Sequence, residues 1–437
     1  MALTRVHRTR LALVTVVATA SLLTVAACRA NQAPPQAGSG NSVPSPVAGS
    51  PTKPAASPAT PPQAGGGSKP TASPSTSPTK PAPLPVNLSK APPALGVQFH
   101  GVWEMYWNSG GATPNSMFWR HLDELAKYHV SMLRVDIGWS SSQPTNAPPT
   151  MNNTHNKRIA TILKAAADRK MKVLLTMHQS PNWARPGTGD EAKQLPTNPD
   201  SIRPWATWLA RTFGKQVEGF EVWNEPNLTA FTQISDPRKR AARYVPLLKA
   251  AAQGLRAGDP SVTVVFGGPA QTDDLFIKDA YAAGAKPYFD VMAIHPYQGN
   301  ETIAPESTDS VGKWRMTNFP AIVKLMADNG DSKKPVWWTE FGFSVHSNTG
   351  VTQQWMMGVP TATISGDYLR RSLELARTRY PQVRVAIVYV AYKPYSAANN
   401  GQQFGYRLLE SSGKPLAQLP MLGGYMAKFN GAVRPLH

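Results

Sequence analysis

Short apolar runs and longer amphipathic runs alternate eight times between residues 95 and 437, and this alternation constrains the fold most. Strands are predicted at Leu95–Phe99, Met132–Ile137, Lys172–Met177, Val217–Trp223, Val262–Phe266, Phe289–Ile294, Pro335–Thr339 and Val385–Val390. Helical periodicity follows at Ser116–Tyr128, Lys157–Arg169, Pro204–Phe213, Ala241–Ala257, Leu275–Ala283, Phe319–Asn329, Tyr368–Arg379 and Leu416–Lys428. Strands that alternate with helices form parallel sheets, and eight such units predict a single (β/α)8 or TIM barrel over residues 95–437. An open doubly wound sheet competes, but no glycine-rich phosphate loop opens any helix.

The first 27 residues have the order of a secretory signal. Arg5, Arg8 and Arg10 precede an apolar run and then the small residues before Cys28, which is typical of a signal peptide rather than a spanning helix. Small residues directly before a cysteine resemble a bacterial lipobox. Residues 1–27 are therefore predicted to be a lipoprotein signal peptide and Cys28 the lipidated anchor on the outer face of the cell membrane. An ordinary secretion signal with an incidental cysteine is the alternative.

Residues 28–94 are expected to form a disordered tether between this anchor and the barrel. Residues 29–93 contain 17 of the 42 prolines and no Asp or Glu. Such a segment buries too little apolar surface to offset its ordering entropy. Fully extended, it could reach on the order of 200 Å. Because Cys28 is the only cysteine, the barrel has no internal disulfide.

The chain is basic, with 45 Lys and Arg against 26 Asp and Glu. The first 94 residues hold eight of the basic residues and none of the acidic ones, which leaves 37 against 26, or +11, in the predicted barrel. This favours a generally basic secreted surface, with attraction to an anionic polymer as the other interpretation. No basic run with interleaved aromatic residues suggests a nucleic-acid partner.

Two of the predicted strands run into a glutamate at their carboxyl ends. Residues 219–227 read GFEVWNEPN and contain Asn224 and Glu225, and residues 335–342 read PVWWTEFG and contain Glu340. Regular alternation would place Asn224 and Glu225 on opposite faces. For both to reach one ligand, the strand must bulge or kink there. Two carboxyl groups at one end of a barrel fit the acid/base and the nucleophile of glycoside hydrolysis.

The WNEPN and WWTEFG motifs, in this order and spacing, resemble the fourth- and seventh-strand motifs of clan A retaining glycoside hydrolases, most closely families 39 and 5. The resemblance implies a hydrolase that acts by double displacement on a poly- or oligosaccharide, with no cofactor. Glu225 would be the general acid/base, its pKa raised by a neighbouring carboxylate. Glu340 would be the ionised nucleophile, with the two carboxyl groups ~5–5.5 Å apart.

The resemblance also implies roles for polar residues at other strand ends. Asn224 would hold the sugar 2-hydroxyl, and Arg134 and Tyr297 would hydrogen-bond Glu340. His178 and His295 would line the substrate site. Judged without the family, Arg134 would be an ion-pair partner and Tyr297 a rim aromatic residue. Three further acids near the pocket are expected to be structural: Glu104, Asp136 and Glu221.

Tryptophans near the strand ends are candidates for stacking on the apolar face of a sugar, although each one alone could equally be core. The candidates are Trp103, Trp107, Trp139, Trp183 and Trp338. The clan usually has a tryptophan at the end of its eighth strand. This chain reads VYVAYKPY there and offers tyrosines instead.

Two other classes of protein compete with a glycosidase. A metal-dependent barrel hydrolase would need clustered ligands, but the first strand ends in one histidine, His100, so no metal site is predicted. A surface glycan-binding protein on a non-catalytic barrel is the second alternative, and the presence of both glutamates argues against it. A monomer is expected.

Overall fold

A computed structural model of the chain describes residues 91–437 except 188, 191–192, 309–313 and 397–400. The predicted signal peptide, the lipidation site Cys28 and the tether up to residue 90 lie outside the described residues. The rest forms the predicted (β/α)8 barrel, which is thereby confirmed. Its strands are β1 (Ala94–Gln98), β2 (Met132–Gly138), β3 (Lys172–His178), β4 (Gly219–Val222), β5 (Val264–Phe266), β6 (Met292–Ile294), β7 (Val336–Phe341) and β8 (Val383–Val388).

The strands lie in the order β5-β4-β3-β2-β1-β8-β7-β6, and every neighbouring pair is parallel. A parallel bridge between Val265 and Val291 joins β5 to the residue before β6 and closes the ring. All eight carboxyl ends therefore meet at one end of the barrel, where enzymes with this fold hold their active sites.

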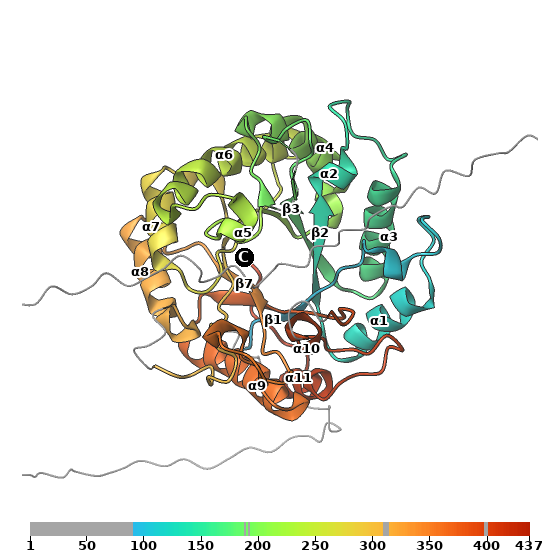
Figure 1. The fold of residues 1–437 in the computed structure, drawn as a ribbon, viewed down its shortest axis with the longest axis vertical. Helices are drawn as coiled ribbons and strands as arrows, with labels where there is room; N and C mark the ends of the chain where they lie inside the picture. Colours follow the sequence, from blue (N-terminus) through green and yellow to red (C-terminus); the bar gives the residue numbers. More distant parts are fainter. Residues whose placement is uncertain (1–90, 188, 191–192, 309–313, 397–400) are drawn as a thin grey trace, which may run out of the picture. The chain divides into compact units, whose positions relative to one another are not determined.

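Helices surround the strands in a ring (Figure 1). The longer ones are α1 (Ser116–Lys127), α3 (Thr154–Asp168), α4 (Arg203–Phe213), α6 (Arg240–Gly258), α7 (Asp274–Ala282), α8 (Phe319–Asp328), α9 (Ala362–Arg379) and α11 (Gln418–Ala427). Three short helices occur in loops: α2 (Trp139–Ser142), α5 (Thr229–Thr232) and α10 (Gln402–Gly405). Helix α1 shows how the sequence sets the start and the buried face of a helix. The side chain of Asn115 caps its first amides, and Phe118, Leu122 and Leu125 form its buried stripe.

Side chains inside the barrel form an apolar layer and a polar layer along the barrel axis. Near the amino ends of the strands, a small apolar cluster fills the interior, with Met132 of β2, Leu174 of β3 and Trp337 of β7 among its members. Two residues further along β2, Arg134 begins a buried polar layer, because alternate residues of a strand face the same side. The larger apolar cluster lies between the strands and the helices. The polar layer therefore packs against the apolar cluster at the amino ends of the strands.

The barrel begins earlier than predicted. Ala91 is buried, β1 starts at Ala94, and the carbonyl of Pro92 accepts a hydrogen bond from the amide of Arg434. The predicted boundary at residue 95 therefore assigns the last tether residues wrongly. They are held because the chain's end covers the amino-terminal side of the barrel, where the indole of Trp337 donates to the carbonyl of Leu436.

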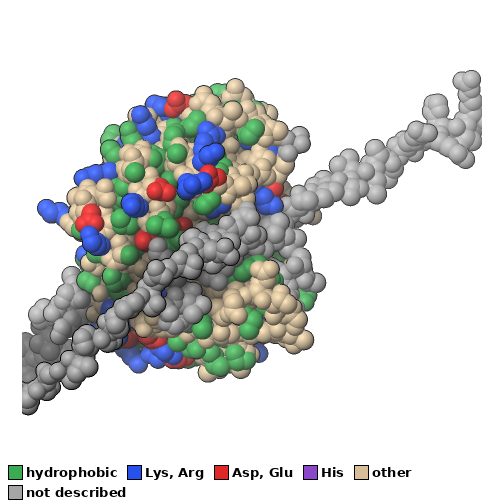
Figure 2. Space-filling view, turned by 60° about the vertical axis from the view of Figure 1, so that its left-hand side comes forward, with side chains coloured by type: hydrophobic (Ala, Val, Ile, Leu, Met, Phe, Trp, Pro, Cys, Tyr) green, Lys and Arg blue, Asp and Glu red, His purple; other side chains and the backbone are tan. Residues whose placement is uncertain are grey.

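Several charged residues of the barrel's exterior are paired along helices. Lys164 with Asp168 and Lys324 with Asp328 are examples at i,i+4 spacing. On the face shown in Figure 2, lysines and arginines are interspersed with acidic side chains. Within the described part of the chain, no helix has both the length and the apolarity that a membrane crossing requires.

Candidate active site

The end of β4 has the kink that the Asn-Glu pair requires. The strand stops at Val222, and both Trp223 (φ 76°) and Glu225 (φ 42°) adopt left-handed backbone conformations. Hydrogen bonds from the Glu225 amide to the Gly268 carbonyl and from the Trp223 amide to the Met177 carbonyl hold this path. The prediction of a kink is confirmed. A left-handed conformation is costly for a residue with a side chain, and such residues concentrate at functional sites.

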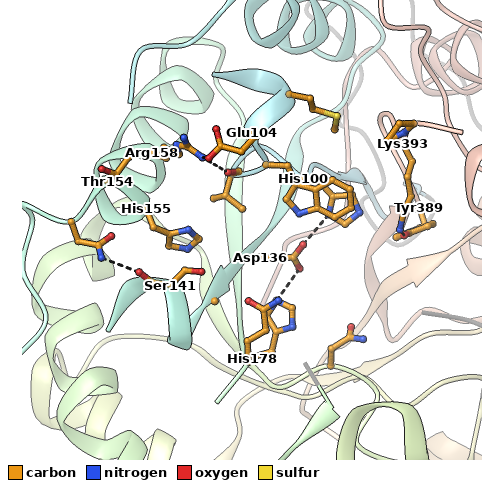
Figure 3. Close-up of a pocket in the computed structure, with 18 of the residues that line it drawn as sticks. His100, Glu104, Asp136, Ser141, Thr154, His155, Arg158, His178, Tyr389 and Lys393 are labelled. Atoms are coloured by element: carbon orange, nitrogen blue, oxygen red, sulfur yellow. Dashed lines mark hydrogen bonds and ion pairs between the residues drawn. The ribbon is translucent and has the colours of Figure 1, made fainter. Parts of the chain in front are cut away.

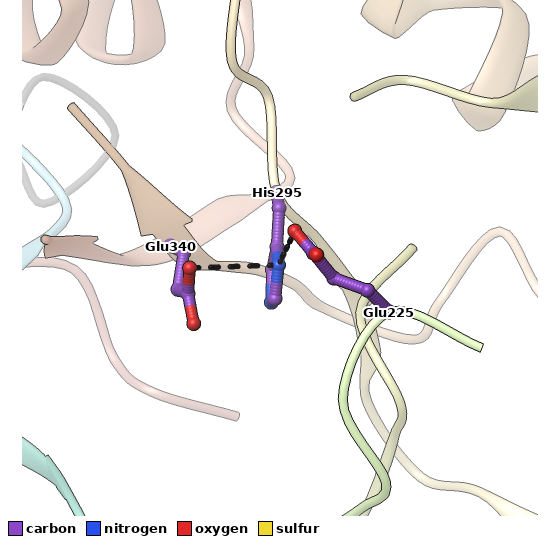
Figure 4. A group of neighbouring side chains, drawn as sticks. All are labelled: Glu225, His295 and Glu340. Carbon is purple, nitrogen blue, oxygen red and sulfur yellow. Dashed lines mark hydrogen bonds and ion pairs between the residues drawn. The ribbon is translucent and has the colours of Figure 1, made fainter. Parts of the chain in front are cut away.

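Glu225 and Glu340 face each other across the carboxyl end of the barrel, with His295 between them (Figure 4). One side-chain atom from each of the three lies within 4.8 Å of the others. Nδ1 of His295 is 3.0 Å from Oε1 of Glu225 and 3.9 Å from Oε2 of Glu340. Such a trio could also ligate a cation. Here, however, protein donors already contact Glu340, and a guanidinium supplies positive charge beside it.

Arg134 organises the polar layer beneath this pair. Its Nε lies 2.6 Å from Oε2 of Glu221, its Nη1 2.5 Å from Oε1 of Glu340, and its Nη2 2.8 Å from Oδ1 of Asn224. The planar guanidinium thus places three side chains from two strands in fixed positions. Glu221 is fully buried and also accepts from Thr176, so its predicted structural role fits the geometry.

The nucleophile candidate receives a second donor from β6. Tyr297 lies three residues beyond this strand, and its hydroxyl donates to Oε2 of Glu340 at 3.1 Å. One oxygen of Glu340 thus accepts from Arg134 and the other from Tyr297. Donors on both oxygens stabilise the carboxylate anion.

The pKa values of Glu225 and His295 are both raised in the folded protein. Burial raises the pKa of Glu225, and the negative charge of Glu340 adds to this, whereas the hydrogen bond from His295 opposes it. Burial would lower the pKa of His295, but Glu340, Glu221 and Glu225 outweigh burial and raise it to about 9. Burial raises the pKa of Glu225 more than the neighbouring carboxylate does, although the sequence prediction named only the carboxylate.

A glycine after β5 makes room for His295. A Cβ at Gly268 would lie 2.6 Å from Nε2 and Cδ2 of the imidazole and 2.8 Å from Oγ1 of Thr339. Real Cβ atoms do not approach other atoms so closely. Gly268 therefore determines where His295 can lie, and pattern reading passed over it because an isolated glycine after a strand is also typical of a turn.

A cavity of about 790 Å³ opens beside Glu340 and Asn224 and extends toward the amino end of α3 (Figure 3). His178 and Trp103, two of the predicted substrate-binding residues, line it. Arg134 and His295 are 1% and 0% exposed, so they lie behind the carboxylates and would act through them. Tyr297 is buried beside Glu340.

The structure does not bring most of the tryptophan candidates to this cavity. Trp139 is completely buried and stacks on Trp205, so it has no face to offer a sugar. Trp183 is half-buried, donates to the carbonyl of Gln143 and is not among the cavity's lining residues. Trp107 and Trp338 are core residues. Trp139 is therefore a core residue, because indoles near strand ends also fill the space between strands and helices, whereas the stacking role of Trp183 stays a prediction.

Two cavity residues were not among the predicted site residues. Asp136, two residues after Arg134 on β2, lies between His100 and His178 (Figure 3). Lys393 lies in the segment after β8, and its ammonium group donates to Tyr389 and Gln403. Both could have been found from position, since Asp136 shares a strand face with Arg134 and Lys393 stands at a strand end.

Solved structures with similar folds are glycoside hydrolases. A family 39 glycoside hydrolase from Bacteroides cellulosilyticus WH2 has a TM-score of 0.57 at 19% identity, over 77% of this chain and 64% of that one. A GH5_18 variant from Streptomyces cattleya in complex with Manb1-4GlcNAc scores 0.58 at 15% identity, over 77% and 80%. The exo-beta-1,4-mannosidase Op5Man5 from an Opitutaceae bacterium (strain TAV5) scores 0.56 at 15% identity, over 78% and 60%. The chain thus spans less than two thirds of the first and third of these proteins. At such identities the likeness concerns the fold.

Sequence comparison assigns the family. A search of curated proteins found no match. The family model described as cellulase (glycosyl hydrolase family 5) matches residues 100–368, which is more than half of the chain. This match and the structural neighbours confirm the predicted resemblance to clan A glycoside hydrolases of families 39 and 5. The chain is a member of the cellulase family, glycosyl hydrolase family 5.

Proposed function

We propose that this glycoside hydrolase retains anomeric configuration and cleaves β-linked poly- or oligosaccharides by double displacement. The observation that carries the proposal is the close pairing of Glu225 and Glu340, whose nearest oxygens lie within 4.8 Å. Retaining enzymes keep their carboxyl groups ~5–5.5 Å apart, whereas inverting enzymes leave ~6.5–9.5 Å for a water molecule. The close approach of these oxygens supports the retaining mechanism.

The two carboxyl groups differ in the way that this mechanism requires. Glu340, anchored by Arg134 and Tyr297, attacks the anomeric carbon and forms the glycosyl-enzyme bond. Glu225, whose pKa is raised by burial, donates its proton to the leaving glycosidic oxygen and then removes a proton from the incoming water. Asn224, held by Arg134, contacts the 2-hydroxyl of the sugar in the −1 position. His295 positions Glu225.

The proposal extends to the enzyme's location. The amino-terminal sequence supports a lipoprotein anchored through Cys28 on the outer face of the bacterial membrane, with a proline-rich tether of about 65 residues. The barrel would then meet polysaccharide at a distance from the membrane. A monomer suffices for this arrangement, since both carboxyl groups come from one chain.

Labelling with 2-deoxy-2-fluoro β-glycosides that carry an activated leaving group tests the proposal. The fluorine slows both steps and the leaving group restores the first, so a glycosyl-enzyme should accumulate on the peptide that contains Glu340. Glu340→Gln should remain folded and unlabelled. Turnover with inverted product configuration, measured by NMR, would refute the retaining mechanism. Glycan binding without any turnover or labelling would favour the non-catalytic alternative.

A further inference from the structure

The cavity contains polar atoms that the described protein leaves without partners. Both ring nitrogens of His178 and Nε2 of His100 are buried and make no hydrogen bond. Oδ2 of Asp136 accepts from Gln98 and His100, and Oδ1 lies 3.8 Å from Nε2 of His178. A buried polar group without a partner costs about 1–3 kcal/mol. A set of such groups around one cavity therefore points to a ligand with several hydroxyl groups.

Lys393 adds a donor on the opposite wall (Figure 3). It is 7% exposed and lines the cavity. Its Nζ lies 2.8 Å from the hydroxyl of Tyr389 and 3.1 Å from Oε1 of Gln403, both uncharged acceptors. An ammonium group has three donors, so one remains for a ligand. No carboxylate among the described residues lies within ion-pair distance of Nζ.

An aromatic platform connects the two walls. The imidazole of His100 stacks on Trp103, with ring centroids 4.1 Å apart and planes 5° apart. Nζ of Lys393 lies 5.3 Å from the centre of the Trp103 ring. Trp103 is half-buried and lines the cavity. Of the five tryptophan candidates it alone does so, which makes it the available surface for the apolar face of a sugar.

The charges of this cavity favour an uncharged sugar. Burial lowers the pKa of Lys393 to about 8, and the negative charges of Glu340 and Asp136 oppose this decrease. Glu340 and Asp136 line the same cavity as Lys393, and their negative charges would repel a uronate. A hydroxyl group, in contrast, can accept from Lys393 and donate to Asp136.

We infer that Asp136 and Lys393 hold hydroxyl groups of a neutral sugar ring that packs on Trp103, and that they thereby select the glycone. The ring lies on the side of Glu340 and Asn224, which line the same cavity. Asp136 comes from β2 and Lys393 from the segment after β8, where this chain lacks the tryptophan that the clan usually has. This inference rests on the proposed glycosidase function and adds the class of sugar that the site accepts.

The test uses the full chain and 4-nitrophenyl β-glycosides of glucose, mannose, galactose, xylose and glucuronic acid. kcat/KM is measured for the wild type, Lys393→Met, Asp136→Asn and Lys278→Met, the last being an exposed lysine on α7 that serves as control. The best neutral glycoside is then replaced by its monodeoxy analogues. Binding of the matching methyl glycosides is measured in parallel by saturation-transfer NMR, which requires no turnover.

Removal of one particular hydroxyl should lower the wild-type kcat/KM about 10- to 100-fold, the size of a hydrogen bond to a charged group. The same removal should have little further effect in Lys393→Met or Asp136→Asn, and the glucuronide should not exceed the glucoside in the wild type. Equal sensitivity of wild type and variants to every deoxy analogue would overturn the inference. So would a preference for the glucuronide that Lys393→Met abolishes.

The two proposals can fail separately. If no glycoside is turned over, the glycosidase proposal fails, while NMR binding that depends on Asp136, Lys393 and the same hydroxyl would still support the inference. If neutral methyl glycosides do not bind and are not turned over, the inference fails as well. Should Lys393→Met not fold, Asp136→Asn and Lys393→Gln provide the same comparison.

Discussion

Replacing His295 with asparagine should remove a part of the protein's stability that depends on pH. His295 is fully buried, and its pKa is about 9 in the folded protein against an ordinary value of 6.5. At 1.36 kcal/mol per pKa unit, this difference corresponds to about 3 kcal/mol of unfolding free energy. Because the folded-state pKa is the higher one, the stabilisation is complete below about pH 6.5 and is lost as pH rises through about 9.

Urea unfolding of the full chain at pH 6 and pH 10 measures this effect. The difference in unfolding free energy between wild type and His295→Asn should be about 3 kcal/mol larger at pH 6 than at pH 10. His129→Asn, at an exposed position, controls for the loss of an imidazole as such. A difference of the same size at both pH values would refute the reasoning that Glu221, Glu225 and Glu340 keep His295 protonated.

Three further predictions concern other residues. Glu225→Gln should lower kcat/KM for glycosides with poor leaving groups by about 10²–10⁴-fold, the usual contribution of general acid catalysis. The loss should be far smaller for dinitrophenyl glycosides. Equal losses on the two kinds of substrate would remove Glu225 from the acid role. Burial raises the pKa of Glu301 from 4.5 to about 8 in the folded protein. As pH rises from about 4.5 to 8, the unfolded chain loses this proton more readily than the folded one, so the free energy of unfolding falls. Glu301→Gln should therefore raise Tm more at pH 9 than at pH 5. Cys28→Ala should release the protein from membranes on cell fractionation, and continued membrane association would contradict the lipid anchor.

Local pattern was enough for the fold and for the two glutamates. The period of two in the strands and 3.6 in the helices depends only on backbone geometry, so all eight units could be read from the order of apolar residues. The ends of elements were less accurate. The predicted strand at Phe289–Ile294 is regular only over Met292–Ile294, with Val291 joined to β5 by a single bridge. The predicted start of the barrel at Leu95 missed the contact between Pro92 and Arg434, which joins residues far apart in the chain.

Among the site residues too, some could be predicted from local pattern and others could not. Glu225 and Glu340 could be identified because each stands in a motif at a strand end, and the kink at Glu225 followed from the alternation of a strand. Trp139 could not be separated from Trp103, since an indole has the same local signature in a core and on a cavity wall. Which of them faces a sugar depends on packing against Trp205 in one case and His100 in the other.

The sequence by itself determined that this chain forms a parallel barrel and presents two carboxyl groups at its carboxyl end, because hydrogen-bonding periodicity and strand direction are local properties. Only the tertiary structure decided what surrounds those groups. Burial of Glu225, the guanidinium of Arg134 beside Glu340 and the meeting of Asp136 with Lys393 across one cavity all arise from residues tens to hundreds of positions apart. Electrostatic interactions depend on the distance between charges and on the exclusion of water, and local sequence pattern predicts neither of them.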